Sequence, residues 1–587
     1  MKQRFFYFLC AALIVPAFVS AQTQMLIPLS SSIYAEVDAL YMIQKLGTPS
    51  TARPWTTTET LMILDRIDES KLNGTEARIY NQIRAQVSKP LRFGFDRITR
   101  MDASFEGALE MYAHTNSKDY VNEEDWQNNF VKRAPLAKVN LAMGMGSWFS
   151  VFSDLQYSYN FNTDDKDQYS YAGAYPGGIG AIIPEIPDGG TEEFKIRTFA
   201  PAYAASFMHN WPPHTYDMEC VFPKRAFLSF GGEHWNLSFG RDRFEWGNGH
   251  SGNFVIGGHR DFDNFVRFSA FTDRFRYEIL NTIYDKYDYD GTGIKKSRYF
   301  LTHRLEFRIL PSLVFTISEN IMYQDQSFNI RYLNPAFIYH NWDEKELFNA
   351  IAHAELDFAV APGWNIYMQY TLDQAQAPNE NDSESDAWGI LAGVEYAGAF
   401  NILNRPALLS LSLEAAYTTP LLYRRDRVDF LILNRRLSFN EGDIFSFEYI
   451  GYQYGGDTML LQLDANLRVP GSWDASLRLL GMIHGNINPW ASHNKDGDNS
   501  GKANYGGSTP SGANSEHEST FVASLRGNYA IPLPVKWPEL SAWAQVDIIS
   551  KTNKLMYDTT GTIPSVIYHK PGISADMQFS IGMRIKL

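Results

Sequence analysis

The fifteen C-terminal residues, 573–587, alternate between apolar and polar or small side chains without interruption. The apolar row consists of Ile573, Ala575, Met577, Phe579, Ile581, Met583, Ile585 and Leu587. Since successive strand residues point to opposite faces, the segment predicts a strand with one apolar and one hydrophilic face. Strands of soluble β-sandwiches are usually far shorter, about five or six residues. A long terminal strand between lipid and water is typical of bacterial outer-membrane β-barrels.

Upstream segments show the same alternation, with charged, amide or hydroxyl side chains between apolar ones in residues 353–360, 409–415 and 461–469. A charged side chain is costly when it faces lipid and tolerated when it faces a wet lumen. We therefore expect the apolar rows to form the outer face of the barrel and the polar rows to face its lumen.

The connections between these segments are of two kinds. Short ones contain Pro with Gly or Ser and occupy residues 310–312, 360–364 and 469–473. Long polar ones occupy residues 172–190, 373–386 and 494–518. Short periplasmic turns and long extracellular loops are the asymmetry of outer-membrane barrels. The sequence thus predicts an all-β transmembrane fold, a large antiparallel outer-membrane β-barrel of about 16 to 18 strands.

The first 21 residues have the features of a secretory signal peptide. Lys2 and Arg4 precede an apolar run, and the small residues at 19–21 predict cleavage before Gln22. After cleavage only Cys220 remains, which excludes an intramolecular disulfide. The expected location is the outer membrane of a Gram-negative bacterium, with outer-membrane lipid around the barrel. The C-terminal strand is expected to be the part that engages the barrel-assembly machinery.

Residues 22–90 differ from the rest and predict three short amphipathic helices. Gly47 ends the first helix, Thr56 and Glu59 have the spacing of a capping box at the start of the second, and Pro90 ends the third. We expect a small periplasmic helical bundle in front of a barrel formed by residues 91–587. Two arrangements are compatible with this pattern: a bundle that closes the lower mouth of the barrel, and an independent bundle on a flexible attachment.

Composition limits the partners. Aromatic residues make up 14% of the chain, an excess that two interfacial aromatic girdles would account for. A net charge of −14 argues against nucleic acid as a partner. Two acidic clusters, Asp285, Asp288 and Asp290, and Asp496 and Asp498, do not complete a calcium loop, and the histidines lack zinc-site spacing. No metal ion and no cofactor is therefore expected.

The densest unusual segment spans residues 239–261, where alternating charges enter a Gly-Asn-Gly sequence. Such a segment indicates a backbone that turns sharply or folds into the lumen. Trp stacks on sugar faces, whereas Arg, Asp, Asn and His bind hydroxyls and carboxylates. The candidate saccharide-binding residues are Arg241, Asp242, Arg243, Trp246, Asn248, His259, Arg260 and Asp261. The competing interpretation is an ion-pair network on the barrel wall that supports an inserted loop.

A second segment, residues 331–342, is unusually rich in aromatic residues, and Asn334 with Pro335 breaks its strand pattern. Asn334 and Tyr339 are further candidates for saccharide binding, if the segment folds beside the first one. An interfacial aromatic belt is the alternative interpretation of the same residues.

The order of parts and three motifs resemble the capsule assembly proteins of the Wzi type. The motifs are the run 237–243, then Trp246-Gly247-Asn248-Gly249, then Phe254-Val255-Ile256-Gly257-Gly258, with 331–335 similar to a later Asn-Pro element. The family pattern has Pro where this chain has Asn248. The resemblance implies an outer-membrane barrel with a periplasmic helical bundle that holds capsular or related exopolysaccharide at the cell surface without catalysis.

Two other functions are known for barrels of this kind. A substrate-selective or general diffusion channel is the alternative to saccharide attachment, and it predicts stable conductance in planar bilayers. A barrel hydrolase is disfavoured because neighbouring strand residues such as His250 and Ser251 point apart, and no Ser, His and acid set has recognisable spacing. The sequence therefore predicts a protein that is not an enzyme.

Overall fold

The computed structural model describes residues 24–587 apart from 121–122, 162–169, 172–194, 197–204, 288–294, 335–347, 375–385, 424–427, 439–441, 486–507, 535–537 and 558–566. The predicted signal peptide, most of the long polar loops and the clusters around Asp288, Asp290, Asp496 and Asp498 lie outside this part. Within it, no helix is both long and apolar enough to cross a membrane.

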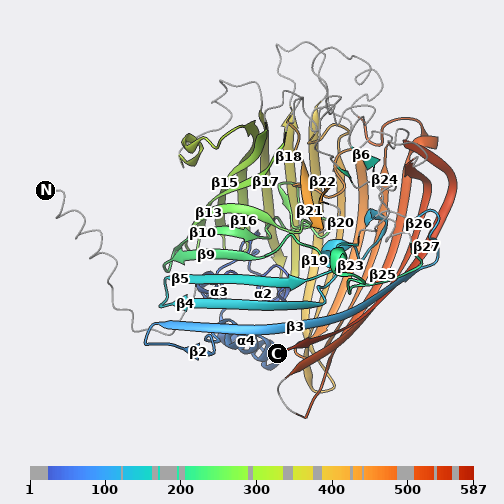
Figure 1. Ribbon diagram of the computed structural model, residues 1–587. Helices are drawn as coiled ribbons and strands as arrows, with labels where there is room; N and C mark the ends of the chain where they lie inside the picture. The colour runs from blue at the N-terminus through green and yellow to red at the C-terminus, as the bar shows by residue number, and fades with distance from the viewer. Residues whose placement is uncertain are drawn as a thin grey trace.

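The main body is a closed antiparallel barrel of 18 strands (Figure 1). Its last strand pairs with its first, Gln578 to Lys586 lying opposite His114 to Glu106, so the sheet has no open edge along this seam. The strand number falls at the upper end of the predicted range. In chain order the strands are β3 (Thr99–His114), β4 (Ala137–Met145), β5 (Phe149–Tyr157), β9 (Ala226–Gly231), β10 (Trp235–Asp242), β13 (Asp263–Phe271), β14 (Phe275–Tyr287), β15 (Lys296–Leu310), β16 (Leu313–Asp325), β17 (Phe348–Ala361), β18 (Trp364–Gln374), β19 (Ala387–Ile402), β20 (Arg405–Thr418), β23 (Thr458–Val469), β24 (Trp473–His484), β25 (Glu518–Ile531), β26 (Glu539–Tyr557) and β27 (Ile567–Lys586).

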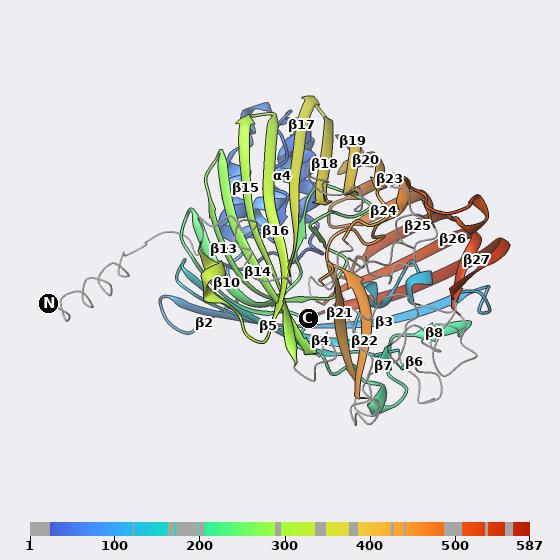
Figure 2. The same cartoon turned by 90° about the horizontal axis from the view of Figure 1, so that it is seen from above.

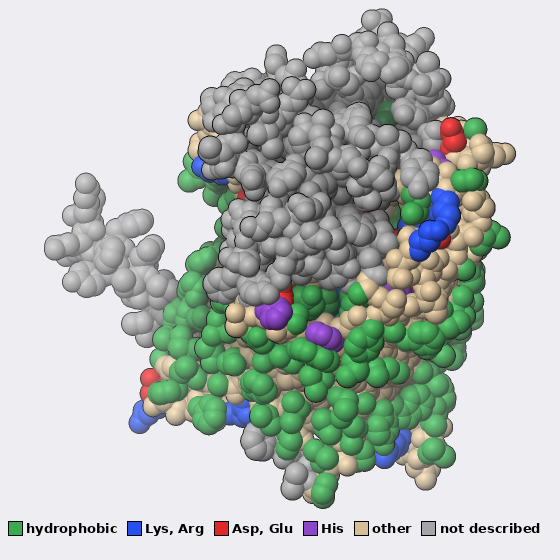
Figure 3. Space-filling view, turned by 45° about the vertical axis from the view of Figure 1, so that its right-hand side comes forward, with side chains coloured by type: hydrophobic (Ala, Val, Ile, Leu, Met, Phe, Trp, Pro, Cys, Tyr) green, Lys and Arg blue, Asp and Glu red, His purple; other side chains and the backbone are tan. Residues whose placement is uncertain are grey.

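The outer face of the barrel is apolar, as the alternation predicts. On β27, Ile581 is 53% exposed while its neighbour Ser580 is 1% exposed, and on β23 Leu461 and Gln462 differ in the same way. Figure 3 shows hydrophobic side chains spread over one outer face of the molecule. Polar side chains alternate with the apolar ones along each strand and point inward. The same strands can therefore face hydrocarbon on the outside and a hydrated lumen on the inside.

The short connections identified in the sequence are hairpin turns at one end of the barrel. They join β15 to β16, β17 to β18, and β23 to β24. The strand ends that flank the longer connections, such as the end of β18 at Gln374 and the start of β19 at Ala387, lie at the opposite end of the barrel (Figure 1). This asymmetry matches the expected arrangement of periplasmic turns and extracellular loops.

Within residues 24–98, three helices lie at the positions that the helical spacing predicts: α2 (Ile33–Ile43), α3 (Thr57–Asp65) and α4 (Gly74–Val87). Thr56 caps α3 by accepting a hydrogen bond from the backbone N–H of Glu59. The predicted capping box is wrong in its second half, because the Glu59 carboxylate pairs with Arg276 on the barrel wall. A complete capping box instead starts α4, between Asn73 and Glu76.

Replacing Asn73 by alanine is expected to lower the free energy of unfolding by about 1 kcal/mol. Its side-chain oxygen accepts hydrogen bonds from the backbone N–H groups of Thr75 (2.8 Å) and Glu76 (3.0 Å), which would otherwise lack partners. Urea unfolding followed by tryptophan fluorescence measures the change, with Lys71→Ala in the exposed turn before α4 as control. If Asn73→Ala and Lys71→Ala unfold at the same urea concentration, the Asn73 cap does not stabilise the protein and the prediction is wrong.

The helices pack against the end of the barrel that carries the short turns, where α2 and α4 contact β18, β19 and β20 (Figures 1 and 2). Their apolar faces form a buried cluster with Ala397 and Leu408 of the barrel wall. Hydrogen bonds tie the helical region to four hairpins: Gly47 N to Pro311 O (3.0 Å), Gly363 N to Met42 O (2.7 Å), Arg78 Nη2 to Asn401 Oδ1 (2.7 Å) and Arg66 Nη2 to Thr272 O (2.8 Å). These contacts favour the first of the two predicted arrangements, a bundle seated on the barrel mouth.

The largest buried cluster lies inside the barrel. The connection between β10 and β13, here called the inward segment (residues 243–262), folds into the lumen. Its strands β11 (Glu245–Trp246) and β12 (Ile256–Gly257) form a three-stranded sheet with β1 (Ala52–Arg53) of the N-terminal region. Phe254, Val255 and Ile256 are 0 to 3% exposed in the resulting core. Most of the motif residues thus belong to a structure that fills part of the lumen.

The remaining strands are accessory. β2 (Phe93–Gly94) and β8 (Phe207–His209) pair with β3, and a separate four-stranded sheet contains β6 (Ser170–Tyr171), β7 (Lys195–Ile196), β21 (Leu431–Ser438) and β22 (Gly442–Tyr449). Short 3-10 turns occur at η1 (Glu69–Lys71), η2 (Glu123–Asp125), η3 (Phe130–Lys132), η6 (Thr215–Asp217), η7 (Ile330–Leu333) and η9 (Asn514–Glu516).

Candidate functional site

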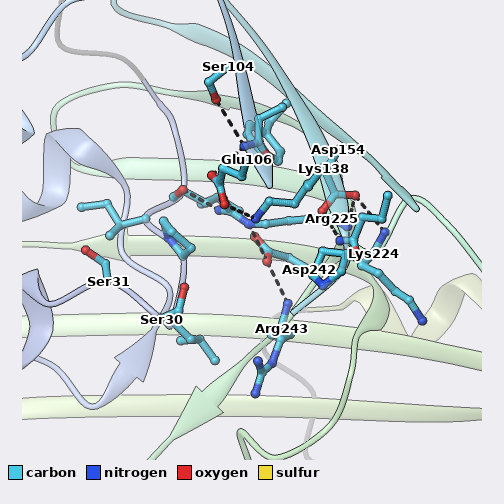
Figure 4. Close-up of a pocket in the computed structure, with 18 of the residues that line it drawn as sticks. Ser30, Ser31, Ser104, Glu106, Lys138, Asp154, Lys224, Arg225, Asp242 and Arg243 are labelled. Atoms are coloured by element: carbon cyan, nitrogen blue, oxygen red, sulfur yellow. Dashed lines mark hydrogen bonds and ion pairs between the residues drawn. The ribbon is translucent and has the colours of Figure 1, made fainter. Parts of the chain in front are cut away.

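A cavity of about 740 Å³ lies between the N-terminal segment, strands β3 to β5 and the start of the inward segment. Among the predicted residues, Asp242, Arg243 and Asp261 line it. Figure 4 shows Glu106, Lys138 and Arg225 near Asp242, with Ser30 and Ser31 of the N-terminal segment on another side. The cavity therefore brings together parts of the chain that are more than a hundred residues apart in sequence.

The cavity wall carries many charges of both signs. Its cationic residues are Lys89, Arg133, Lys138, Lys224, Arg225, Arg243 and Lys586, and its acidic residues are Asp102, Glu106, Asp154, Asp242 and Asp261. Several of these charges are paired across strands. Lys138 Nζ lies 3.0 Å from Glu106 Oε2, and Asn140 Nδ2 donates to Glu106 Oε1 over 2.9 Å. The wall thus presents both donors and acceptors in fixed positions.

Aromatic rings hold the cations in place. The Arg225 guanidinium lies 4.8 Å from the centroid of the Phe152 ring and 5.1 Å from that of Phe227. Arg133 lies between Tyr112 (4.1 Å) and Phe161 (4.4 Å) in the same manner. A guanidinium over a ring face is attracted by the ring quadrupole, so these side chains are pre-oriented at low cost in entropy.

Asp242 and Arg243 connect the cavity to the lumen core. Asp242 is 3% exposed, and its Oδ1 accepts hydrogen bonds from Arg225 Nε (2.8 Å) and from the backbone N–H of Arg243 (2.9 Å). Arg225 also donates to the backbone carbonyl of Leu26 over 2.6 Å, which attaches the N-terminal segment to the site. Asp242 Oδ2 and Arg243 Nε are buried without a hydrogen-bond partner among the described residues. Buried polar groups in this state are uncommon and suit a place where a polar ligand binds.

Trp246 is buried, whereas the sequence makes it a candidate for stacking on a sugar. The indole is 0% exposed and packs beneath Arg304, whose guanidinium lies 5.4 Å from the ring centroid. The indole is enclosed in the lumen core because its strand, β11, is the central strand of the three-stranded sheet, between β1 and β12. In this arrangement Trp246 supports the inward segment and presents no ring face to a saccharide. The sequence could not distinguish a buried indole from an accessible one.

The other predicted residues of the inward segment and of β10 serve mainly as internal contacts. Arg241 donates to Asn264 Oδ1 (2.9 Å) and to the carbonyl of Pro223 (3.0 Å). Asn248 Nδ2 donates to Asp357 Oδ2 (3.1 Å) and Glu395 Oε2 (3.2 Å) of the wall. These contacts fit the ion-pair and hydrogen-bond network that was the competing interpretation of the segment.

His259 to Asp261 form the end of the inward segment. Burial and the neighbouring Arg260 guanidinium lower the pKa of His259 to about 3, so the imidazole is neutral at physiological pH. Arg260, 4% exposed, pairs with Asp263 over 3.1 Å. The Asp261 carboxylate pairs with Lys224 at the cavity edge.

The second predicted segment is not part of the cavity. Asn334 is exposed at the end of η7, on the connection between β16 and β17, and does not line the cavity. Tyr339 lies outside the described residues. In the described part of the chain no group of three or more His, Cys, Asp or Glu residues is arranged to hold a metal ion.

The sequence prediction missed the cavity residues on the barrel wall. Lys138 and Asn140 alternate with Val139 and Leu141 on β4, so their inward orientation follows from the strand pattern. Which strands enclose a cavity depends on where the N-terminal segment packs, and no local motif encodes that. Lys224 and Arg225 lie just before β9 and carry no pattern of their own.

No protein-family model matches the chain, and no curated protein matches it in sequence. Among solved structures, the chain is similar to Wzi of Escherichia coli, with a TM-score of 0.55 and 12% sequence identity. The alignment covers 96% of this chain and 99% of that chain. Wzi is described as a carbohydrate-binding β-barrel and an outer-membrane protein involved in group 1 capsule assembly. The outer-membrane channel DcaP of Acinetobacter baumannii gives a TM-score of 0.33 at 8% identity, covering 85% and 100%. OprD of Pseudomonas aeruginosa gives 0.35 at 11% identity, covering 83% and 94%. The first similarity shows the shared fold of an outer-membrane β-barrel.

Proposed function

We propose that the protein resides in the outer membrane of a Gram-negative bacterium and attaches or assembles capsular or exopolysaccharide at the cell surface by non-catalytic saccharide binding. The signal peptide, residues 1–21, is removed on export, and residues 22–90 form a periplasmic bundle at the mouth of the barrel of residues 91–587. Outer-membrane lipid surrounds the apolar face, and the C-terminal strand engages the barrel-assembly machinery.

The observation that carries this proposal is the composition of the cavity. Cations held on aromatic rings lie next to carboxylates and amides, with Asp242 and Arg243 at the edge. Sugars present many hydroxyls and, in acidic polymers, carboxylates, which this mixture of donors, acceptors and rings can bind. In this proposal the saccharide is contacted by Asp242, Arg243 and Asp261. The inward segment is held in position by Arg241, the buried Trp246, His259 and Arg260.

The proposal includes no catalytic step. His250 Nε2 lies 2.7 Å from Glu395 Oε1, whereas Ser251 Oγ lies 3.0 Å from the hydroxyl of Tyr452. The two neighbours therefore have separate partners and do not form a nucleophile and base pair.

A diffusion channel is the second candidate function. It is favoured by polar side chains on the inner face of β23 and β24 that are partly accessible: the side chains of Asp464 and Arg478 are 20% and 39% exposed. A wet, charged inner wall is what a porin-type lumen requires. Ion flux without any effect on surface polysaccharide is the result expected of this function.

The proposal predicts that a deletion strain makes polysaccharide at normal total yield but sheds it into the medium. Complementation with the double variant Lys138→Ala/Arg243→Ala is expected to restore barrel levels but not attachment, because two cavity cations are lost. Cell-bound and released polymer are quantified separately, with Lys71→Ala, an exposed lysine away from the cavity, as control. A deletion strain with an unchanged distribution overturns the attachment function and leaves the channel as the better candidate.

A further inference from the structure

Residues 247–253 of the inward segment, here called the latch loop, are attached to the barrel wall by carboxylates. The Glu414 carboxylate of β20 accepts hydrogen bonds from the backbone N–H groups of His250 (Oε2, 2.8 Å) and Ser251 (Oε1, 2.8 Å). The hydroxyl of Tyr367 on β18 donates to the same carboxylate over 2.7 Å. Glu414 is 1% exposed, so its charge is satisfied almost entirely by these donors.

A second carboxylate holds the side chains of the loop. His250 Nε2 lies 2.7 Å from Glu395 Oε1 on β19, and Asn248 donates to both Glu395 and Asp357. Asn365 on β18 donates to the same two carboxylates, over 3.1 Å to Asp357 and 2.9 Å to Glu395. The loop therefore seats on three wall carboxylates that belong to β17, β19 and β20.

The remaining contacts of the latch loop are also mostly polar. Gln453 Nε2 donates to the backbone carbonyl of Ser251 over 2.7 Å, and Gln369 Nε2 donates to Asn253 Oδ1 over 2.6 Å. Near its ends, Gly247 and Gly252 have φ values of +124° and +138°, which glycine adopts without strain. The latch loop is thus held by hydrogen bonds, whereas the adjacent residues Phe254 to Ile256 are anchored by apolar packing.

We propose that the latch loop is an inner gate: seated on Glu414, Glu395 and Asp357 it closes the lumen along β17 to β20, and its release opens a path for ions and small polar solutes. This activity does not rest on saccharide attachment; it rests on the diffusion channel described above as the second candidate function. The path would adjoin the partly accessible polar wall at Asp464, which is close enough to act electrostatically on His250.

The charge state of His250 contributes to the closed state. Although partial burial opposes the charged ring, whose side chain is 35% exposed, the hydrogen bond and charge of Glu395, with Glu414 and Asp464 nearby, raise the pKa of His250 to about 9. The phenols of Tyr367 (β18) and Tyr452 (the segment after β22) face the loop, together with the carboxylates of Asp38 (α2), Glu245 (β11), Asp357 (β17), Glu395 (β19), Glu414 (β20) and Asp464 (β23). They are almost all acidic, so a protonated His250 offsets their repulsion.

The sign of the pH effect follows from this shift. A pKa raised from about 6.5 in a released, solvated ring to about 9 in the seated loop stabilises the seated loop fully below pH 6.5. That contribution is lost as pH rises through 9. The gate is therefore expected to open more often between pH 7 and pH 9.5.

The test is single-molecule conductance of the purified full-length protein in planar bilayers. We expect low conductance for the wild type at pH 7 and an open fraction roughly tenfold higher for Glu414→Gln, which replaces a charged acceptor by a neutral amide. Asp474→Asn is the matched control, because Asp474 is a carboxylate of β24 that accepts from Asn528 and does not contact the loop. Equal conductance of Glu414→Gln, Asp474→Asn and the wild type overturns the gate.

A second variant keeps the test decisive if Glu414→Gln does not fold. His250→Asn leaves both backbone hydrogen bonds to Glu414 in place and removes only the titrating ring. The wild type is expected to open more between pH 7 and pH 9.5, whereas His250→Asn is expected to be open more often at pH 7 and to lack that rise. An alkaline rise of the same size in both proteins overturns the role of His250 and the gate with it.

Discussion

Replacing Glu278 by alanine is expected to destabilise the folded barrel by about 3 to 5 kcal/mol. Glu278 lies on β14 and is 0% exposed. It pairs with Arg267 (Nε to Oε1, 2.7 Å) and with Arg276 (Nη2 to Oε2, 2.5 Å), and Arg276 in turn pairs with Glu59 of α3. Removing the carboxylate leaves two buried guanidinium groups with one carboxylate between them, in a place that water does not reach.

The same network attaches α3 to the barrel wall, so the loss has a structural consequence. Without Glu278, Arg276 has no second carboxylate to hold it toward Glu59, and the helical region is expected to become more sensitive to protease. Urea unfolding in detergent, followed by tryptophan fluorescence, measures the stability change. Glu233→Ala on the exposed β9–β10 turn is the control, with an expected change within about 0.5 kcal/mol. Similar midpoints for the two variants would show that the network adds nothing to stability.

Replacing Gly257 by alanine is expected to cost about 3 kcal/mol, the upper end of the range for overpacking. A Cβ at this position would lie 2.2 Å from the backbone carbonyl oxygen of Gly451 and 2.5 Å from His259 Nδ1. The backbone N–H of Gly257 donates to the carbonyl of Ile450 over 2.9 Å. Because the obstacle is backbone, it cannot rotate away, and the inward segment must separate from the segment that follows β22.

The matched control is Gly74→Ala at the start of α4, where an added Cβ meets nothing within 4 Å. Alanine is the better helix former, so this variant is expected to be neutral or stabilised by up to about 1 kcal/mol. Limited proteolysis of the two variants reports whether residues 243–262 leave the core. A Gly257→Ala protein that resists protease and denaturant as well as Gly74→Ala would contradict the close approach of these backbones.

The barrel itself was predictable because its signal is repeated. Each strand encodes an apolar outer row and a polar inner row, and residues such as Leu461 and Gln462 lie on the faces that the alternation assigns to them. The turns were predictable for a similar reason: Pro-Gly pairs next to Trp364 and Trp473 start new strands. The three helices followed from apolar spacing and capping residues, although Glu59 found a partner on β14 instead of completing a capping box.

The candidate site was only partly predictable. The charges of residues 241–243 indicated an unusual segment, and Asp242 and Arg243 do line the cavity. The burial of Trp246 depends on β1, which lies almost two hundred residues earlier in the chain, and local sequence does not encode that contact. For the same reason Lys138 and Arg225 became candidates only once the N-terminal segment was placed against β3 to β5.

The central claim is that the folded barrel binds saccharide in the cavity. The most direct measurement is calorimetric titration of the purified full-length protein with polysaccharide isolated from the surface of its own host cells. The account predicts saturable binding by the wild type, and binding at least about tenfold weaker for Lys138→Ala/Arg243→Ala, since each charge-assisted hydrogen bond contributes about 1.5 to 3 kcal/mol. A wild-type protein that is folded but binds no polymer, or a double variant that binds as tightly as the wild type, would contradict it.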